Sequence, residues 1–264
     1  GSVITWGRPP YGGDSSSVSS DLSSSVTEIF STTSAFAALK SDGSVITWGW
    51  STKGGDSSSV SSDLNSDVTE IFSTTVSFAA LKSDGSVITW GDSLNGGNSS
   101  SVSSDLSSDV TEIFSTGFSF AALKSDGSVI TWGGTWGGSS YGGDSSSVSS
   151  DLNSDVTEIF STVFSFAALK SDGSVITWGH SLNGGNSSSV SSDLSSDVTE
   201  IFSTDRAFAA LKSDGSVITW GGSNDGGDSS SVSIFLNSGV TDIFSTPGAF
   251  AALLQAPLDD DGDG

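Results

Sequence analysis

The sequence contains one histidine, His180, which is the residue that a serine–histidine–acid hydrolase would require. In such a site the imidazole takes the proton of a serine hydroxyl while a carboxylate orients the ring. Serine is so frequent in this chain that its nearness to His180 carries no information, and no nucleotide-binding loop motif stands out. His180 also replaces Asp92 in an otherwise matching loop, which is typical of a tolerant surface position. The sequence therefore predicts a protein that is not an enzyme.

The C-terminal tail carries carboxylates at the spacing of a calcium-binding loop. Residues 259–264 read D-x-D-x-D-G, so Asp259, Asp261 and Asp263 match the first half of an EF-hand-type loop. The chain stops before the distal acidic ligand, so we expect weak calcium binding and no other cofactor. The competing interpretation of residues 257–264 is a flexible acidic linker, and both interpretations indicate that a further module follows.

A carboxylate also recurs in each copy of a repeated VTEIF segment or its variant VTDIF. These acids are Glu28, Glu70, Glu112, Glu158, Glu200 and Asp242. A ring of carboxylates could hold a cation in a central channel, because hard cations take oxygen ligands. We favour the alternative that each acid pairs with a nearby lysine or faces solvent.

Aromatic and arginine side chains are the strongest candidates for a binding surface. Both arginines, both tyrosines, His180 and the two tryptophans outside the repeated core occur in two variable segments, a triplet that follows VTEIFST and a loop that follows each WG. The candidates are Arg8, Tyr11, Trp50, Phe118, Trp136, Tyr141, Phe164, His180 and Arg206. Aromatic residues and arginine dominate binding hot spots. We predict that these residues contact a partner, and the alternative is that they only cover neighbouring loops.

A repeat that runs through nearly the whole chain positions these residues. The segment GSVITWG begins at residues 1, 43, 85, 127, 173 and 215. Successive copies are 42 residues apart, except for one interval of 46. Periods of about 20–50 residues are typical of solenoids, propellers and arrays.

Each repeat contains three segments with the composition of β-strands. VTEIF is rich in β-branched and aromatic residues, and FAALK and SVITW flank an Asp-Gly pair. Asp-Gly between two such runs predicts a tight hairpin with a type I′ turn. SSSVSSDL is either a short fourth strand or an extended connection, and no stretch has helical periodicity.

The order of these strands predicts one variable face and one constant face. The first strand ends at the variable triplet, the second ends at the constant SDGS turn, and the third ends at the variable WG loop. Both variable sets should therefore lie on the same face, where a rigid scaffold commonly carries recognition loops.

The two ends of the chain carry complementary parts of one repeat. Residues 1–7 match a third strand, whereas residues 240–245 and 250–254 match a first and a second strand. We therefore expect an all-β fold, a closed six-bladed β-propeller over residues 1–256 with one blade shared by the two ends. The alternative is an arbitrary cut through a longer array.

The string ALKSDGSVITWG followed by a glycine-rich loop resembles the RCC1-type repeat. Its short period is closest to the branch of that family that includes bacterial β-lactamase inhibitor proteins. The resemblance implies a propeller whose loops on one face bind a protein partner. The chain departs from the family in its six predicted blades, since both groups typically have seven, and it lacks the wedge-sized insertion of the nuclear members. Inhibition of a β-lactamase is therefore not implied.

The charge balance limits the partners that such a face can have. The chain has 8 Lys and Arg against 31 Asp and Glu, a net charge of −23. Such a surface repels phosphate backbones and anionic lipids, so we expect no nucleic-acid partner. No apolar run reaches the roughly 18 residues of a membrane-spanning helix, so we expect no membrane insertion.

These observations favour a non-enzymatic recognition module that binds a protein partner through the variable face. We expect it to be monomeric and part of a larger secreted or cell-surface bacterial protein. One alternative is a carbohydrate-binding propeller with Tyr11, Trp50, Trp136 and Tyr141 as stacking platforms. Another is a structural spacer whose loop variation has no function.

Overall fold

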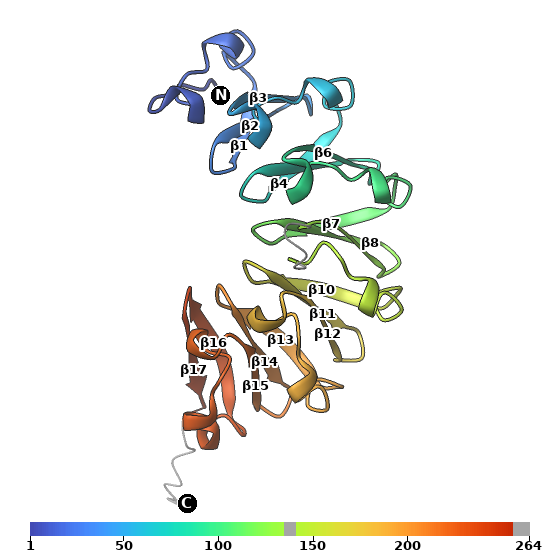
Figure 1. Cartoon of the computed structure of the whole chain (residues 1–264), viewed down its shortest axis with the longest axis vertical. Helices are drawn as coiled ribbons and strands as arrows, with labels where there is room; N and C mark the ends of the chain where they lie inside the picture. Colours follow the sequence, from blue (N-terminus) through green and yellow to red (C-terminus); the bar gives the residue numbers. More distant parts are fainter. Residues whose placement is uncertain (135–140, 256–264) are drawn as a thin grey trace, which may run out of the picture.

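The protein is described by a computed structural model that covers residues 1–134 and 141–255. Its strands form six antiparallel sheets, which we call blades 1 to 6 in chain order. Figure 1 shows that the blades follow one another in an arc from the N-terminal to the C-terminal end.

Blades 1 to 5 have three strands each, and blade 6 has two. The strands of blades 1 to 3 are β1 (Val26–Ser31), β2 (Ala35–Lys40), β3 (Val45–Gly49), β4 (Val68–Ser73), β5 (Ser77–Lys82), β6 (Val87–Gly91), β7 (Val110–Ser115), β8 (Ser119–Lys124) and β9 (Val129–Gly133). Those of blades 4 to 6 are β10 (Val156–Ser161), β11 (Ser165–Lys170), β12 (Val175–Gly179), β13 (Val198–Ser203), β14 (Ala207–Lys212), β15 (Val217–Gly221), β16 (Val240–Thr246) and β17 (Ala249–Leu254).

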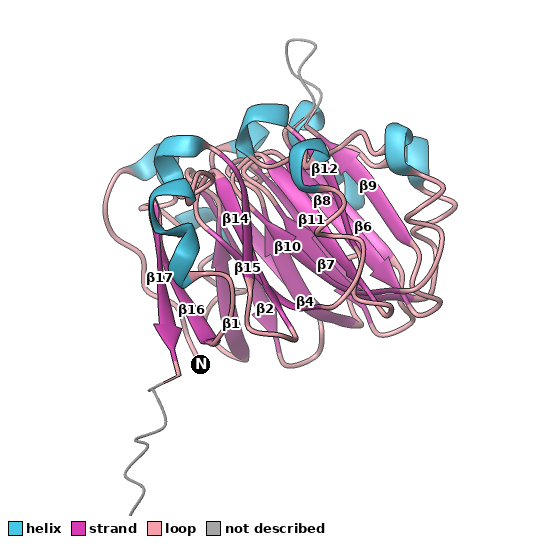
Figure 2. Ribbon diagram, turned by 90° about the horizontal axis from the view of Figure 1, so that it is seen from below, coloured by secondary structure: helices cyan, strands magenta, loops and turns pink. Residues whose placement is uncertain are grey.

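Short 3₁₀ helices connect the blades. They are η1 (Pro9–Tyr11), η2 (Ser16–Val18), η3 (Ser51–Lys53), η4 (Ser58–Val60), η5 (Ser93–Asn95), η6 (Ser100–Val102), η8 (Ser146–Val148), η9 (Ser181–Asn183), η10 (Ser188–Val190), η11 (Ser223–Asp225) and η12 (Ser230–Phe235). Figure 2 shows most of these turns along one margin of the strands and the hairpin turns at the opposite margin. Among the described residues, no helix has the length and apolar character needed to cross a membrane.

The SSSVSSDL segment forms a 3₁₀ turn rather than a fourth strand. In η4 the Asp56 carboxylate accepts a hydrogen bond from the Ser58 amide, which starts the turn. The buried Leu64 at its end accepts from the amide of Val45, so the segment closes the outer edge of the sheet. The serines favour such local side-chain bonds over a sheet ladder.

The Asp-Gly hairpin is present in every three-stranded blade, but its turn is not the type I′ turn that the sequence predicts. Only the glycine has a positive φ, +76° at Gly43, and its amide donates to Lys40 O across the turn. This is the three-residue loop in which a left-handed residue follows the turn and forms a bulge. The Asp42 carboxylate accepts from both the amide and the hydroxyl of Ser44, which stabilises this longer loop.

The core lies between successive blades, because the sheets of blades 2 to 5 are covered on both faces. Leu39 of blade 1 belongs to the same buried cluster as Ile71, Phe78 and Trp90 of blade 2. Trp90 stacks on Phe78 with ring centroids 5.2 Å apart. Its indole Nε1 donates to Gly54 O, 3.0 Å away in the preceding loop. The same Phe–Trp–Gly arrangement recurs in blades 1 to 5, which explains why these strands lack a clean polar–apolar alternation.

The two ends of the arc do not meet in this structure. Residues 1–7 are not assigned as a strand, and β17 pairs only with β16 among the described residues. Trp6 is 85% exposed, whereas its five counterparts are 2–3% exposed. The all-β repeat of three-stranded sheets is confirmed, and the closed ring with one shared blade stays a prediction.

Candidate partner-binding face

The structure places both variable segments of each blade on one face, as the strand order predicts. Backbone hydrogen bonds join the two segments directly. The amide of Trp50 donates to Ser34 O at 2.9 Å, and the amide of His180 donates to Phe164 O at 3.1 Å. We call the surface formed by the triplets and the WG loops the variable face.

Four aromatic rings and one arginine form a continuous cluster across blades 3 to 5. Tyr141 lies 5.3 Å from Phe118 and 5.9 Å from Phe164, between ring centroids. It also stacks on His180 at 5.9 Å, with only 10° between the ring planes. The guanidinium of Arg206 lies 6.0 Å from the Phe164 centroid. We call these five residues the large aromatic cluster.

A second and smaller group lies near the N-terminal end of the same face. The guanidinium carbon of Arg8 lies over the Tyr11 ring, 4.7 Å from its centroid. Tyr11 meets Trp50 edge to face at 5.7 Å. Trp50 is 44% exposed, which is unusual for so large an apolar side chain. We call these three residues the small aromatic cluster.

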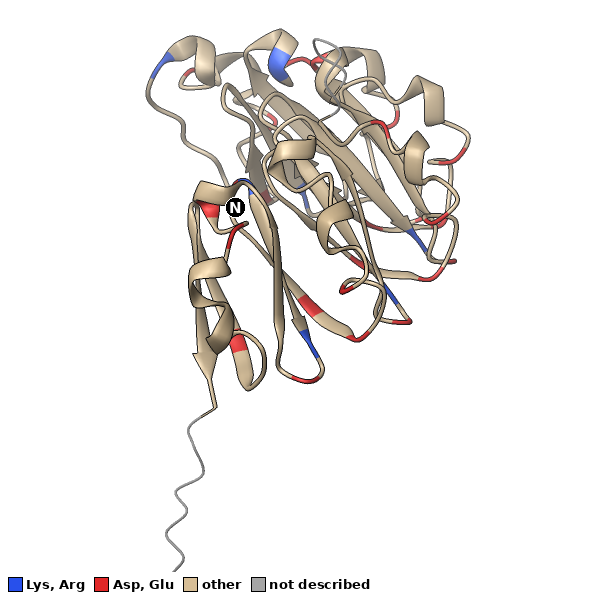
Figure 3. Cartoon of the chain, turned by 60° about the horizontal axis from the view of Figure 1, so that its bottom comes forward, with Lys and Arg blue, Asp and Glu red and all other residues tan. Residues whose placement is uncertain are grey.

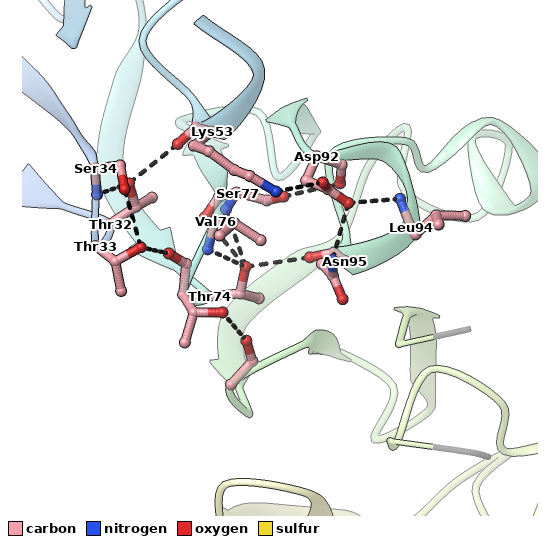
Figure 4. Close-up of polar contacts among 12 residues, drawn as sticks. Thr32, Thr33, Ser34, Lys53, Thr74, Val76, Ser77, Asp92, Leu94 and Asn95 are labelled. Atoms are coloured by element: carbon pink, nitrogen blue, oxygen red, sulfur yellow. Dashed lines mark hydrogen bonds and ion pairs between the residues drawn. The ribbon is translucent and has the colours of Figure 1, made fainter. Parts of the chain in front are cut away.

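An ion pair and its hydrogen bonds join the WG loops that follow blades 1 and 2 (Figure 4). Lys53 Nζ lies 2.8 Å from the Asp92 carboxylate, which also accepts from the Leu94 amide and from Asn95 Nδ2. Partial burial acts to raise the pKa of Asp92, but the hydrogen bond and charge of Lys53, together with the bonds from Asn95 and Leu94, outweigh burial and lower the pKa. A depression of about 370 Å³ beside this pair is lined by Leu94 and Phe118 among others. It therefore connects the ion pair to the large aromatic cluster.

In blades 1 to 5, a threonine at the end of the first strand fixes the loops of this face (Figure 4). Thr74 Oγ1 donates to Asn95 O at 3.1 Å and accepts from the amide of Ser77 at 3.0 Å. Thr116, Thr162 and Thr204 make corresponding bonds in the later blades. A buried hydroxyl with all its bonds made holds each loop in one position relative to its blade.

The triplets also bond to one another along the inner margin of the blades. The amide of Thr33 donates to Thr75 O, and that of Thr75 donates to Gly117 O, each at 3.0 Å. The series continues through Val163 and Asp205 toward blade 6. The spacing of the recognition loops is therefore set by backbone contacts.

Three contributors to the variable face are not among the sequence-predicted site residues. Leu182 is 74% exposed in its WG loop, and Leu94 is its exposed counterpart two blades earlier. Lys53 differs from all other lysines of the chain, which precede the SDGS hairpins. Comparison of the six loops would have found these residues, since each departs from the repeat in residue type.

Some predicted residues lie outside the described part of the chain. These are Trp136 and the tail residues Asp259, Asp261 and Asp263, whose calcium binding stays a prediction. Within residues 1–134 and 141–255, no group of three or more His, Cys, Asp or Glu side chains is arranged to hold a metal ion.

The repeated glutamates lie next to one another along successive first strands, away from the hairpin lysines. Burial and the charges of Glu112 and Glu28 raise the pKa of Glu70, and burial with Glu112 and Glu200 raises that of Glu158. Four of the five hairpin lysines donate instead to backbone carbonyls, as Lys82 does to Asp63 O at 3.1 Å. The row is therefore a site of mutual repulsion. Its five glutamates are exposed to solvent, as one of the two favoured alternatives predicts, whereas the lysine pairing is not seen among the described residues.

The sequence matches no protein-family model and no curated protein. Its structure is similar to several solved repeat structures at low identity. Human WBSCR16 is 17% identical over 74% of this chain and 61% of its own, with a TM-score of 0.47. The yeast RCC1 protein Prp20, bound to Kap60, is 15% identical over 74% of this chain and 56% of its own, with a TM-score of 0.46. The computationally designed Ika8 protein is 16% identical over 89% of this chain and 72% of its own, with a TM-score of 0.38.

The chain thus spans less than two thirds of the WBSCR16 and Prp20 structures. The class that the fold itself defines is an all-β repeat protein of blade-like sheets with one variable face.

Proposed function

We propose that this protein is a non-enzymatic recognition module that binds a protein partner through the variable face. The observation that carries the proposal is the large aromatic cluster, in which residues of three blades touch on one surface. Phe118 and Tyr141 belong to two different variable segments, yet their rings are 5.3 Å apart. Aromatic residues and arginine are the types enriched at binding hot spots.

The rigid attachment of the loops supports recognition by a preformed surface. The triplets are tied to the WG loops of their own blades and to the triplets of the next blades by backbone bonds. Binding to an ordered surface costs less conformational entropy than binding to flexible loops. The variable face therefore needs little rearrangement to contact a partner.

Charge favours a partner with a positive net charge. Figure 3 shows acidic residues over the loops of the blades and few basic ones. The total charge of −23 attracts a cationic protein over a distance set by the ionic strength. We expect association to slow as salt is added, whereas the contacts of the aromatic clusters resist salt.

The contacts of His180 join it to the large aromatic cluster. Its Nδ1 lies 3.0 Å from Asn183 Nδ2 and its ring stacks on Tyr141. We assign His180 to the binding surface.

On composition alone, we also retain the proposal that this is a secreted or cell-surface protein.

Carbohydrate binding is a second candidate, and the exposure of Trp50 favours it. A sugar platform needs a free ring face, which the 44% exposed indole of Trp50 can offer. Tyr141 has His180 stacked on one face, and Tyr11 has Arg8 over its ring, so both are poorer platforms than the sequence suggests.

Substitution of the two phenylalanines tests the proposed face. Phe118→Ser with Phe164→Ser introduces the residue that blade 1 already has at this position, Ser34. Wild type, this variant and a hairpin-face control, Lys124→Ala, would be used to capture proteins from the secretome of the source and to probe a glycan array.

Capture of a protein by wild type and the control but not by the double variant supports the proposal. Capture that survives in the double variant contradicts it. Glycan binding that is lost with Trp50→Ala favours the carbohydrate candidate instead.

A further inference from the structure

The third strand of each interior blade has a fixed set of contacts. In blade 5, Val217 of β15 lies opposite Leu211 of β14, and Trp220 lies opposite Phe208. The Trp220 ring stacks on Phe208 at 5.3 Å, and its Nε1 donates to Gly184 O at 3.0 Å. A third strand is therefore held by its neighbouring strand, by a phenylalanine ring and by a glycine carbonyl.

Residues 1–7 have the sequence of a third strand and only half of these contacts. The amide of Val3 donates to Leu22 O at 2.9 Å, just as the amide of Val45 donates to Leu64 O. Thr5 Oγ1 lies 2.9 Å from Ser15 Oγ, which repeats the Thr47–Ser57 contact. The segment is thus fixed on blade 1, but no second strand pairs with it within the described chain.

Blade 6 has the opposite deficiency. Among the described residues its strand β17 pairs only with β16, and Leu253 is 55% exposed where Leu211 of blade 5 is 8% exposed. A largely apolar cavity of about 540 Å³ lies beside this edge, lined by Gly226, Phe250 and Leu254 among others. Gly226 and Phe250 lie 42 residues after Gly184 and Phe208, one repeat later. They therefore correspond to the two residues that hold Trp220 in blade 5.

The last repeat also carries apolar residues that no other repeat has at these positions. Ile234 and Phe235 replace the Ser-Asp pair of SSSVSSDL, both are exposed, and Phe235 lines the same cavity. Exposed apolar residues concentrated at one site mark an interaction surface. The repeat itself defines what fills such a cavity, because in blades 1 to 5 a VITWG strand does so.

We propose that residues 1–7 of one copy of this chain pair with β17 of a second copy and complete its blade 6. The blade 5 register then places Val3 opposite Leu253 and Trp6 opposite Phe250, with Gly226 O as the acceptor for the Trp6 indole. A second copy is the occupant because the chain's own N-terminal segment is bonded to blade 1, at the other end of the arc (Figure 1).

The proposed interface has a second contact, in which the outer face of blade 1 is covered. Ile29 is exposed where its counterpart Ile71 is buried, and a cavity of about 260 Å³ is lined by Ile4, Trp6, Ile29 and Trp48 among others. Blade 6 of the partner would cover this face as each blade covers the next. Such a head-to-tail contact uses two different surfaces, so it extends to further copies and leads to a ring or a filament.

Disulfide trapping tests the proposal, since the natural chain has no cysteine. The variants Val3→Cys and Leu253→Cys would be mixed and oxidised, because residues directly opposite in antiparallel strands are close enough for a disulfide. We expect covalent dimers in the mixture and a ladder of larger species from the double variant. Ser17→Cys mixed with Leu253→Cys is the matched control, since exposed Ser17 does not face β17 in the proposed register.

Two results would overturn the proposal. If the double variant forms only an intrachain disulfide and the mixture forms no dimer, the ring closes within one chain. If no disulfide forms in either sample, the two edges do not pair.

Trp6→Ser provides a second measurement that does not depend on cysteine. Light scattering should show that the wild-type mass rises with concentration and that this rise is lost in the variant. A concentration-independent monomer mass for wild type contradicts the proposal. The large aromatic cluster of blades 3 to 5 takes no part in this contact, so partner capture by a non-assembling variant separates the failure of this proposal from the failure of the proposed function.

Discussion

Replacement of Trp132 by phenylalanine tests the physical account of the blade interface. Trp132 is 2% exposed, it stacks on Phe120 at 5.2 Å, and its Nε1 donates to Gly96 O at 3.1 Å. Phenylalanine keeps a ring but removes the donor, which leaves the Gly96 carbonyl without this partner. An unsatisfied buried polar group costs about 1–3 kcal/mol. The smaller ring leaves unfilled volume in a packed interface, which adds roughly 1 kcal/mol.

The expected loss of about 2–4 kcal/mol corresponds to a fall in Tm of roughly 4–16 °C for a domain of this size. Urea unfolding followed by fluorescence, with wild type at the same concentration, measures the change. The matched control is Trp6→Phe, since Trp6 is 85% exposed and makes no hydrogen bond through its indole among the described residues. For a monomeric sample we expect the control to lie within about 0.5 kcal/mol of wild type.

Two outcomes would refute this reasoning. A Trp132→Phe variant as stable as wild type would mean that the indole–carbonyl bond contributes nothing to the interface. An equal loss for Trp6→Phe in a monomeric sample would mean that Trp6 is buried within its own chain, and hence that the ring is closed.

Three further predictions follow from the site and the titrating groups. Phe118→Ser with Phe164→Ser should weaken partner binding at least 30-fold, about 2 kcal/mol at a hot spot, with Tm changing far less than in Trp132→Phe. Glu70→Gln with Glu158→Gln should raise Tm at pH 7, on the order of 1 °C. Burial and neighbouring glutamates raise both pKa values, so the difference should shrink as the pH falls toward 4.5, and a constant difference contradicts this explanation. Hydrogen bonds from Ser128 lower the pKa of Asp126, so Asp126→Asn should lower Tm slightly at pH 7, and this loss should vanish as the pH falls below 3.8. Equal losses in thermal scans at pH 7 and at pH 2.5 would contradict the Asp126 prediction.

The sequence alone determined the repeat, its three strands and the face on which variable residues gather. These features depend on local patterns, because VTEIF and SVITW favour strands and an Asp-Gly pair between FAALK and SVITW forms a hairpin turn. The direction of each strand then follows from short connections, so Phe118 and Tyr141 had to lie at the same end of their blade.

The tertiary structure decided those features for which the local sequence is consistent with more than one conformation. The Asp-Gly pair is consistent with two hairpin loops, and the bonds from Ser44 to Asp42 accompany the longer one. The stacking of Tyr141 on His180 depends on the spacing between adjacent blades, which no single repeat encodes. Whether the ends meet depends on small rotations summed over all blade interfaces. Each rotation is set by packing at contacts such as that of Phe78 with Trp90. The repeat sequence therefore determines the strands of each blade but leaves open whether the blades close into a ring.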